Sequence, residues 1–71
     1  MKRYAIVIEK ALANYTAYVP DLPGCVATGV TVAETESMLR EAIELHLEGM
    51  REDGMSIPAP MSVVVYLDVP A

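Results

Sequence analysis

The stretch TVAETESMLREAIELHLEGMREDG, residues 31–54, decides the fold. Thr31 is followed three residues later by Glu34, which is the spacing of a capping box. In that motif the Thr31 hydroxyl accepts from the Glu34 amide, and the Glu34 carboxylate reaches back to Thr31. Gly54 is placed to adopt the left-handed conformation that ends many helices. We therefore expect one helix that starts after Thr31 and runs to about Glu52.

This helix has two distinct sides when its residues are placed about 100° apart. One side carries mostly apolar residues: Val32, Thr35, Met38, Leu39, Ala42, Ile43, His46, Gly49 and Met50. The opposite side carries charged residues: Glu34, Arg40, Glu41, Glu44, Glu48, Arg51 and Glu52. An amphipathic helix of this kind packs its apolar side against a flat apolar surface.

The rest of the chain supplies that surface as strands. Residues 3–9, 15–19 and 25–30 are rich in β-branched and aromatic side chains, and their short connections favour an antiparallel meander. Residues 61–69 read as a fourth strand. A right-handed crossover through the helix would place it parallel to, and beside, the first strand. The expected fold class is α+β, in the order β-β-β-α-β, with a four-stranded mixed sheet of order 3-2-1-4 and the helix on one face.

Pro20-Asp21-Leu22-Pro23-Gly24-Cys25 separates the second and third strands. Two prolines and a glycine exclude both helix and strand interior, so this is a stiff turn. Asp21 is a standard turn residue. Leu22 is expected to be exposed, where a rigid loop could present it to a partner with little loss of entropy. The alternative is that the turn is purely structural.

Length and composition favour association with other chains. A single domain of 71 residues has little core, and one cysteine and one histidine make neither an internal disulfide nor a closed zinc site. The strands at 3–9 and 61–69 are apolar on both faces, yet one helix covers only one face. We therefore expect a homodimer or larger oligomer. The net charge of −5, with only five Lys and Arg, disfavours direct nucleic-acid binding and suits a basic partner.

The sequence also bears on location. The apolar run at residues 5–8 is too short for a secretory signal, and no uncharged stretch approaches the roughly 20 residues of a membrane helix. We expect a cytoplasmic protein that does not bind membranes, with Cys25 as a reduced thiol.

This order of elements, with these residues, resembles the HicB antitoxin family. The matching stretches are YAIVIE (4–9), YVPDLPGC (18–25), ELHLEGMREDG (44–54) and IPAP (57–60). The resemblance implies a partial ribonuclease-H-like fold without nuclease activity, which binds and silences a small RNA-cleaving toxin, HicA. Many members add a C-terminal DNA-binding domain that represses the operon. Nothing of that kind follows residue 69, so we expect a single HicB-like domain, 1–71, without it.

Five residues are candidates for partner binding: Asp21, Leu22, Glu41, Glu44 and Glu48. The three glutamates form an acidic ridge on the exposed side of the helix, which suits a basic toxin, although a solvated surface is the usual fate of such a charge run. Leu22 and Asp21 come from the rigid turn.

No catalytic, metal or cofactor site is expected. His46 lies near the centre of the apolar helix side, where a buried histidine bonded to a backbone group or a tyrosine is the simpler interpretation. Glu9, Asp21 and Asp68 could imitate the ribonuclease H carboxylates, but two-metal catalysis needs them to converge. Three hypotheses remain: an antitoxin, a stand-alone regulatory or structural homo-oligomer, and a minimal nuclease.

Overall fold

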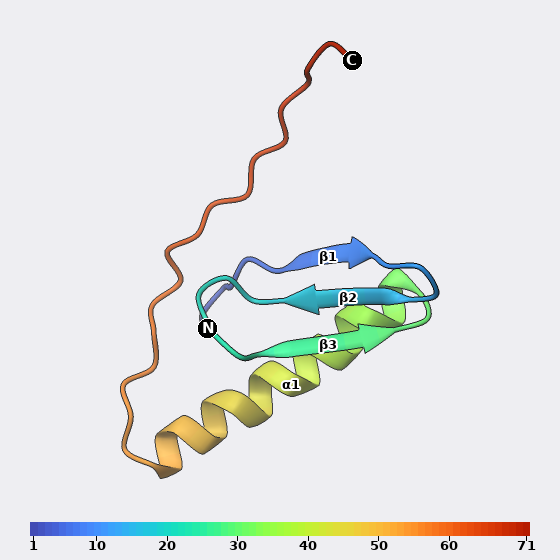
Figure 1. Ribbon diagram of the computed structural model, residues 1–71. Coiled ribbons are helices and arrows are strands. Elements are labelled where there is room, and N and C mark those ends of the chain that lie inside the picture. The colour runs from blue at the N-terminus through green and yellow to red at the C-terminus, as the bar shows by residue number, and fades with distance from the viewer.

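The computed structural model describes all 71 residues as a three-stranded sheet with one helix across it (Figure 1). The strands are β1 (Val7–Lys10), β2 (Tyr15–Tyr18) and β3 (Val26–Gly29), and both pairings are antiparallel in the order β1-β2-β3. The α+β class and the meander are therefore confirmed. Strand β1 is shorter than predicted, because it starts at Val7 instead of Arg3.

Helix α1 (Val32–Glu52) has the predicted bounds, and it begins after Thr31 and ends before Gly54 as predicted. Of the two hydrogen bonds of the predicted capping box, the one to the Thr31 hydroxyl is formed. The Thr31 hydroxyl accepts a 3.0 Å hydrogen bond from the Glu34 amide. At the other end Gly54 has φ of 68°, and the Met55 amide donates to the Met50 carbonyl at 2.8 Å. This is the Schellman arrangement that satisfies the last carbonyls. The helix is not long and apolar enough to cross a membrane.

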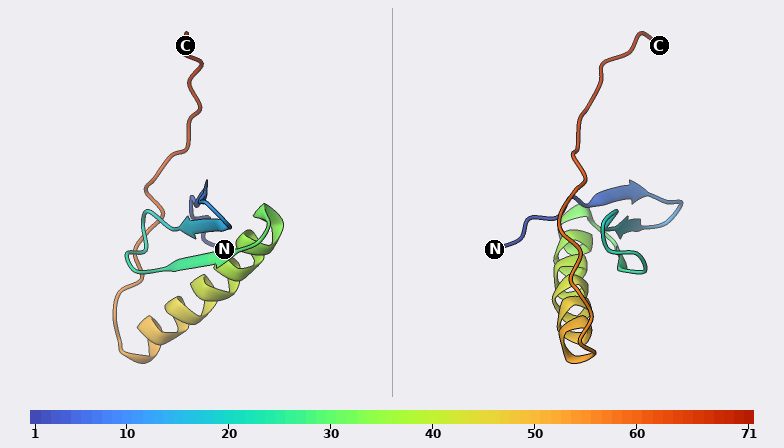
Figure 2. Two further views of the ribbon diagram at one scale, coloured as in Figure 1. Left: turned by 45° about the vertical axis from the view of Figure 1, so that its right-hand side comes forward. Right: turned by 90° about the vertical axis from the view of Figure 1, so that its left-hand side faces the viewer.

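The two faces of the sheet differ because side chains alternate along each strand. Ala17 is buried, and Ile8, its partner across β1 and β2, packs against the core beneath α1. Val7, Tyr18 and Val26 are paired in one row on the other face, where Tyr18 and Val26 are exposed. One face of the sheet is thus covered by the helix (Figure 2), and the other carries an open apolar row.

The core lies between α1 and the end of the sheet where β2 leads into β3. Its five buried side chains are Ala17, Val19, Leu22, Cys25 and Leu39. Tyr4, Ile6, Ile8, Ala27, Ala42, Ile43 and Leu47 pack around them and are half-buried. Leu39 is the one member from the helix, and it is fully buried.

Leu22 belongs to this core, so the expectation that it is exposed is wrong. Its side chain is only 1% exposed. The Leu22 amide donates to the Val19 carbonyl at 3.1 Å, and the Cys25 amide donates to the Leu22 carbonyl at 3.1 Å. Two consecutive β-turns therefore meet at Leu22. The second has Pro23 at its second position and Gly24, with φ of 84°, at its third, which is the type II pattern. This double turn directs Leu22 inward.

The C-terminal segment contradicts the predicted fourth strand. Residues 61–69 pair with no strand and run as an extended chain away from the sheet (Figures 1 and 2). Exposure of the large apolar side chains in this segment ranges from 53% at Val64 to 91% at Tyr66. The radius of gyration is 13.7 Å, compared with about 11 Å for a compact chain of this length. The predicted strand order 3-2-1-4 is therefore not formed within the single chain, whose sheet has the order β1-β2-β3.

Candidate partner-binding surface

Three of the predicted contact residues lie together on the solvent side of α1. Glu41, Glu44 and Glu48 are exposed, and at about 100° per residue they fall within a stripe about 60° wide. Leu39, which is fully buried, lies on the opposite side of the helix. We call these three residues the acidic helix surface. Its charge is held on a rigid element, as expected from the sequence.

Apolar side chains that the sequence did not single out flank the acidic helix surface. Leu45 is 70% exposed and Met38 is 47% exposed. Their helical angles place them beside Glu41 and Glu48. The pattern assigned Met38 to the buried side of the helix, because it lies on the border between the two sides. Apolar side chains surrounded by charged ones are the usual composition of a protein interface. Leu45 is thus an exposed leucine beside the acidic helix surface, whereas Leu22 is buried.

The Asp21 side chain is hydrogen-bonded to the C-terminal segment of the same chain. Its carboxylate accepts from the amides of Met61 and Ser62, both at 2.9 Å, and from the Ser62 hydroxyl at 2.8 Å. These hydrogen bonds, led by that of the Ser62 amide, hold the pKa of Asp21 below its ordinary value. Asp21 therefore fixes where the C-terminal segment leaves the body of the protein. Asp21, predicted as a partner-binding residue, thus uses its carboxylate to bind residues of its own chain.

We expect acid to release this attachment. A carboxyl group whose pKa is lowered in the folded state stabilises that state at pH values above its ordinary pKa of 3.8. This stabilisation is lost as the pH falls through the lowered pKa. The Met61 and Ser62 amide protons should then shift in NMR spectra below about pH 4. Asp21→Asn should produce the same shifts at neutral pH. Asp68→Asn, a change in the exposed part of the segment, is the control. Unchanged shifts in Asp21→Asn would contradict the attachment.

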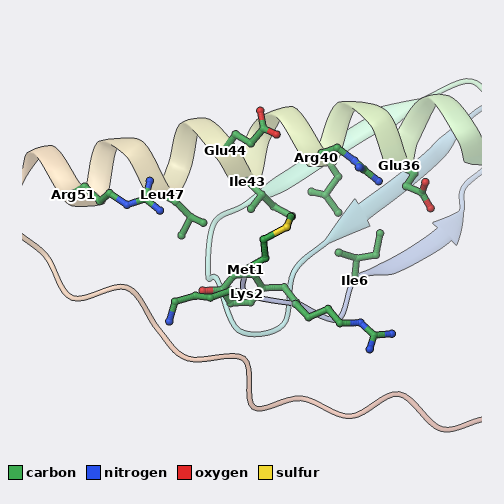
Figure 3. A pocket seen from close by; sticks show the side chains of 12 residues that line it. Met1, Lys2, Ile6, Glu36, Arg40, Ile43, Glu44, Leu47 and Arg51 are labelled. Carbon is green, nitrogen blue, oxygen red and sulfur yellow. The ribbon is translucent and has the colours of Figure 1, made fainter.

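A second surface is a groove between α1 and the residues that precede β1. It has a volume of about 830 Å³. Its apolar lining comprises Met1, Tyr4, Ile6, Leu39, Ile43 and Leu47, and its polar lining comprises Lys2, Arg3, Glu36, Arg40, Glu44 and Arg51. Ile43 and Leu47 point from the helix toward the N-terminal residues, as Figure 3 shows. We call this the N-terminal groove. It lies along the side of the sheet where β1 has no neighbouring strand.

The residues considered for catalysis are not assembled into a site. His46 is half-buried and lines a hollow with Leu22 and Met50, so it is less buried than the predicted core histidine. No three or more His, Cys, Asp or Glu side chains lie together to hold a metal ion, so Glu9, Asp21 and Asp68 do not converge. Burial raises the pKa of the Cys25 thiol, which disfavours the reactive thiolate.

Known proteins similar to this chain are found in viruses, bacteria and archaea. A family model described as the HicB-like antitoxin of bacterial toxin–antitoxin systems matches residues 4–71. An uncharacterized 14.9 kDa protein of Haemophilus phage HP1 is 40% identical over 67 residues, which are 94% of this chain and 50% of the phage protein. A UPF0150 protein of Archaeoglobus fulgidus is 44% identical over 55 residues, 73% of this chain and 80% of that protein. The chain thus spans half the length of the phage relative.

A solved structure is also similar. One chain of the HicA3 and HicB3 toxin–antitoxin complex superposes with a TM-score of 0.72 and 32% sequence identity. The match covers 84% of this chain and 70% of the chain in the complex. The similarity therefore includes most of the sheet-and-helix body described above.

Proposed function

Because the chain belongs to the HicB-like antitoxin family, we propose that it is an antitoxin that neutralises a small, basic, RNA-cleaving HicA-type toxin by protein–protein contact. The observation that carries this proposal is its similarity to a chain solved within a toxin–antitoxin complex. The unit proposed to do this is one HicB-like domain, residues 1–71. It acts by binding, without a catalytic group, metal or cofactor and without contacting nucleic acid.

The acidic helix surface is the proposed docking site. A toxin that cleaves RNA needs positive charge where the phosphates lie. Glu41, Glu44 and Glu48 oppose that charge from a rigid helix, and Leu45 and Met38 offer apolar contact beside them. Occupying the basic surface of the toxin would exclude RNA from it. Asp21 and Leu22 are left out of this surface, since one is bonded to the C-terminal segment and the other is buried.

Co-purification and an RNA-cleavage assay test the function. The chain should bind a HicA-type toxin encoded beside its gene and stop that toxin from degrading RNA at a one-to-one ratio. No binding to any such toxin would favour the stand-alone homo-oligomer. Magnesium-dependent cleavage of RNA by the chain alone, abolished by Asp21→Asn or Asp68→Asn, would favour the nuclease instead.

Charge and apolar contact in the docking site should affect different rate constants. Glu41→Lys with Glu44→Lys should slow association about ten-fold at low salt and flatten its salt dependence, because these charges steer the encounter. Leu45→Ala should mainly speed dissociation. Surface plasmon resonance against the toxin separates the two rates. Leu12→Ala, at another exposed leucine in the β1–β2 turn, is the control. If both variants keep the wild-type rates, the toxin does not bind at this helix surface.

A further inference from the structure

The C-terminal segment has the sequence of a buried strand and the position of an exposed tail. Val63, Val65, Leu67 and Val69 alternate with Val64, Tyr66 and Asp68. All six apolar side chains among these seven residues are exposed. An apolar surface of this kind is rarely left in water by a soluble protein. The segment therefore needs a partner that covers both of its faces.

The sheet has an open position that matches the segment on both faces. Strand β1 is at the edge of the sheet, and α1 lies more against β2 and β3 than against β1. On the helix side of this edge is the N-terminal groove, with its apolar lining. On the other side the open apolar row begins at Val7 and continues through Tyr18 and Val26. A strand placed beside β1 would thus meet apolar side chains above and below.

The outer edge of the β1 backbone is also free to form hydrogen bonds with another strand. The Ala11 amide donates to the Asn14 carbonyl and closes the β1–β2 hairpin. Hydrogen-bonded and non-hydrogen-bonded pairs alternate from there along an antiparallel ladder. The amides of Ile8 and Lys10 therefore point away from β2 toward the open edge. Unpaired edges of this kind are templates for a further strand.

The segment is held so that it leaves its own sheet. The Tyr4 hydroxyl donates to the Pro58 carbonyl, and Asp21 holds the amides of Met61 and Ser62. Two prolines, Pro58 and Pro60, keep the connector extended. From this attachment the chain continues outward and ends far from the sheet (Figures 1 and 2). Residues 63–71 span about 30 Å when extended, which is enough to follow the whole of a β1 edge.

We propose that residues 63–69 form the fourth strand of a second copy of this chain, beside its β1, and that two copies exchange these segments reciprocally. Each copy supplies both the segment and the edge, so the arrangement closes as a symmetric dimer. The exchange also supplies, from the partner, the strand that the order 3-2-1-4 requires. It needs no toxin, so it can be tested on the purified chain alone.

Sedimentation at several micromolar concentrations tests the exchange. The wild-type chain should be a dimer. Val65→Asp should raise the dissociation constant of the dimer about 100-fold, which is about ten-fold for each of the two exchanged segments. Val65 is exposed and outside every element, so this variant should keep the circular dichroism spectrum of α1 and the sheet. Leu12→Asp, which adds the same charge at another exposed apolar position, should remain dimeric. A wild-type monomer, or an unweakened Val65→Asp dimer, would overturn the proposal.

Photo-cross-linking identifies the surface that the segment covers. A chain with p-benzoylphenylalanine in place of Tyr66 is mixed with an equal amount of ¹⁵N-labelled wild type and irradiated. Cross-linked peptides should join the probe to residues 4–10 or 39–47 of the other copy, and hybrid masses should show that two chains are involved. Cross-links within one chain would mean that the segment folds back on its own sheet. Cross-links only between two C-terminal segments would mean that they pair with each other. Either result overturns the exchange.

Discussion

Leu22→Ala should reduce the free energy of unfolding by about 2–5 kcal/mol, the usual cost of truncating a buried leucine. Leu22 is among the most deeply buried side chains of the protein, and it packs in the same cluster as Val19, Cys25 and Leu39. The double turn fixes its backbone through two hydrogen bonds, so the chain has little freedom to fill the cavity. In a domain this small the loss is a large part of the total stability.

Urea denaturation followed by circular dichroism measures this loss, at one fixed protein concentration because dimerisation would add to stability. Leu12→Ala is the control, and it should change the free energy of unfolding by less than about 0.5 kcal/mol, because Leu12 is fully exposed. If Leu22→Ala unfolds at the wild-type midpoint, Leu22 is not in the core. The turn would then again be a candidate for presenting this side chain to a partner.

The elements of the fold that were predictable are those set by local chemistry. The cap at Thr31, the glycine at 54 and the amphipathic pattern between them define α1 without reference to the rest of the chain. The connections of the meander are too short for a crossover, so its strands must pair antiparallel. Most of the helix faces follow from the same period, which is why the acidic helix surface was found in the sequence.

The direction of Leu22 and the placement of residues 61–69 were not predictable, because both depend on geometry beyond the neighbouring residues. The composition of the turn identifies it as a turn, but the direction of Leu22 depends on how two β-turns join and on the left-handed conformation of Gly24. Residues 61–69 have the alternation typical of a strand, but no pattern states which sheet a strand joins, and in the structure these residues pair with none. The exposed Leu45 lies between charged residues of the helix, so the helical pattern does not single it out.

A second large loss of stability is expected from a substitution at Gly29, where β3 lies close to α1. Gly29 is buried, and a Cβ atom there would lie 2.6 Å from the Thr35 hydroxyl oxygen and 2.8 Å from the Thr35 amide nitrogen. Thr35 is fully buried, and its hydroxyl donates to the Thr31 carbonyl at 2.7 Å. Rotating the side chain would relieve only one of these two contacts. Gly29→Ala must therefore displace the first turn of the helix from the sheet.

We expect Gly29→Ala to cost about 1–3 kcal/mol of unfolding free energy, the usual cost of overfilling a packed site. Gly49→Ala is the matched control with the opposite sign. A Cβ at Gly49 would contact nothing within 4 Å, and alanine is favoured over glycine inside a helix by about 1 kcal/mol. Combining Gly29→Ala with Thr35→Ala should recover only part of the loss, because the amide nitrogen of residue 35 remains in the way. Full recovery in the double variant would mean that the Thr35 hydroxyl alone sets the distance between β3 and α1. Equal stabilities of Gly29→Ala and Gly49→Ala would mean that the helix can move freely on the sheet.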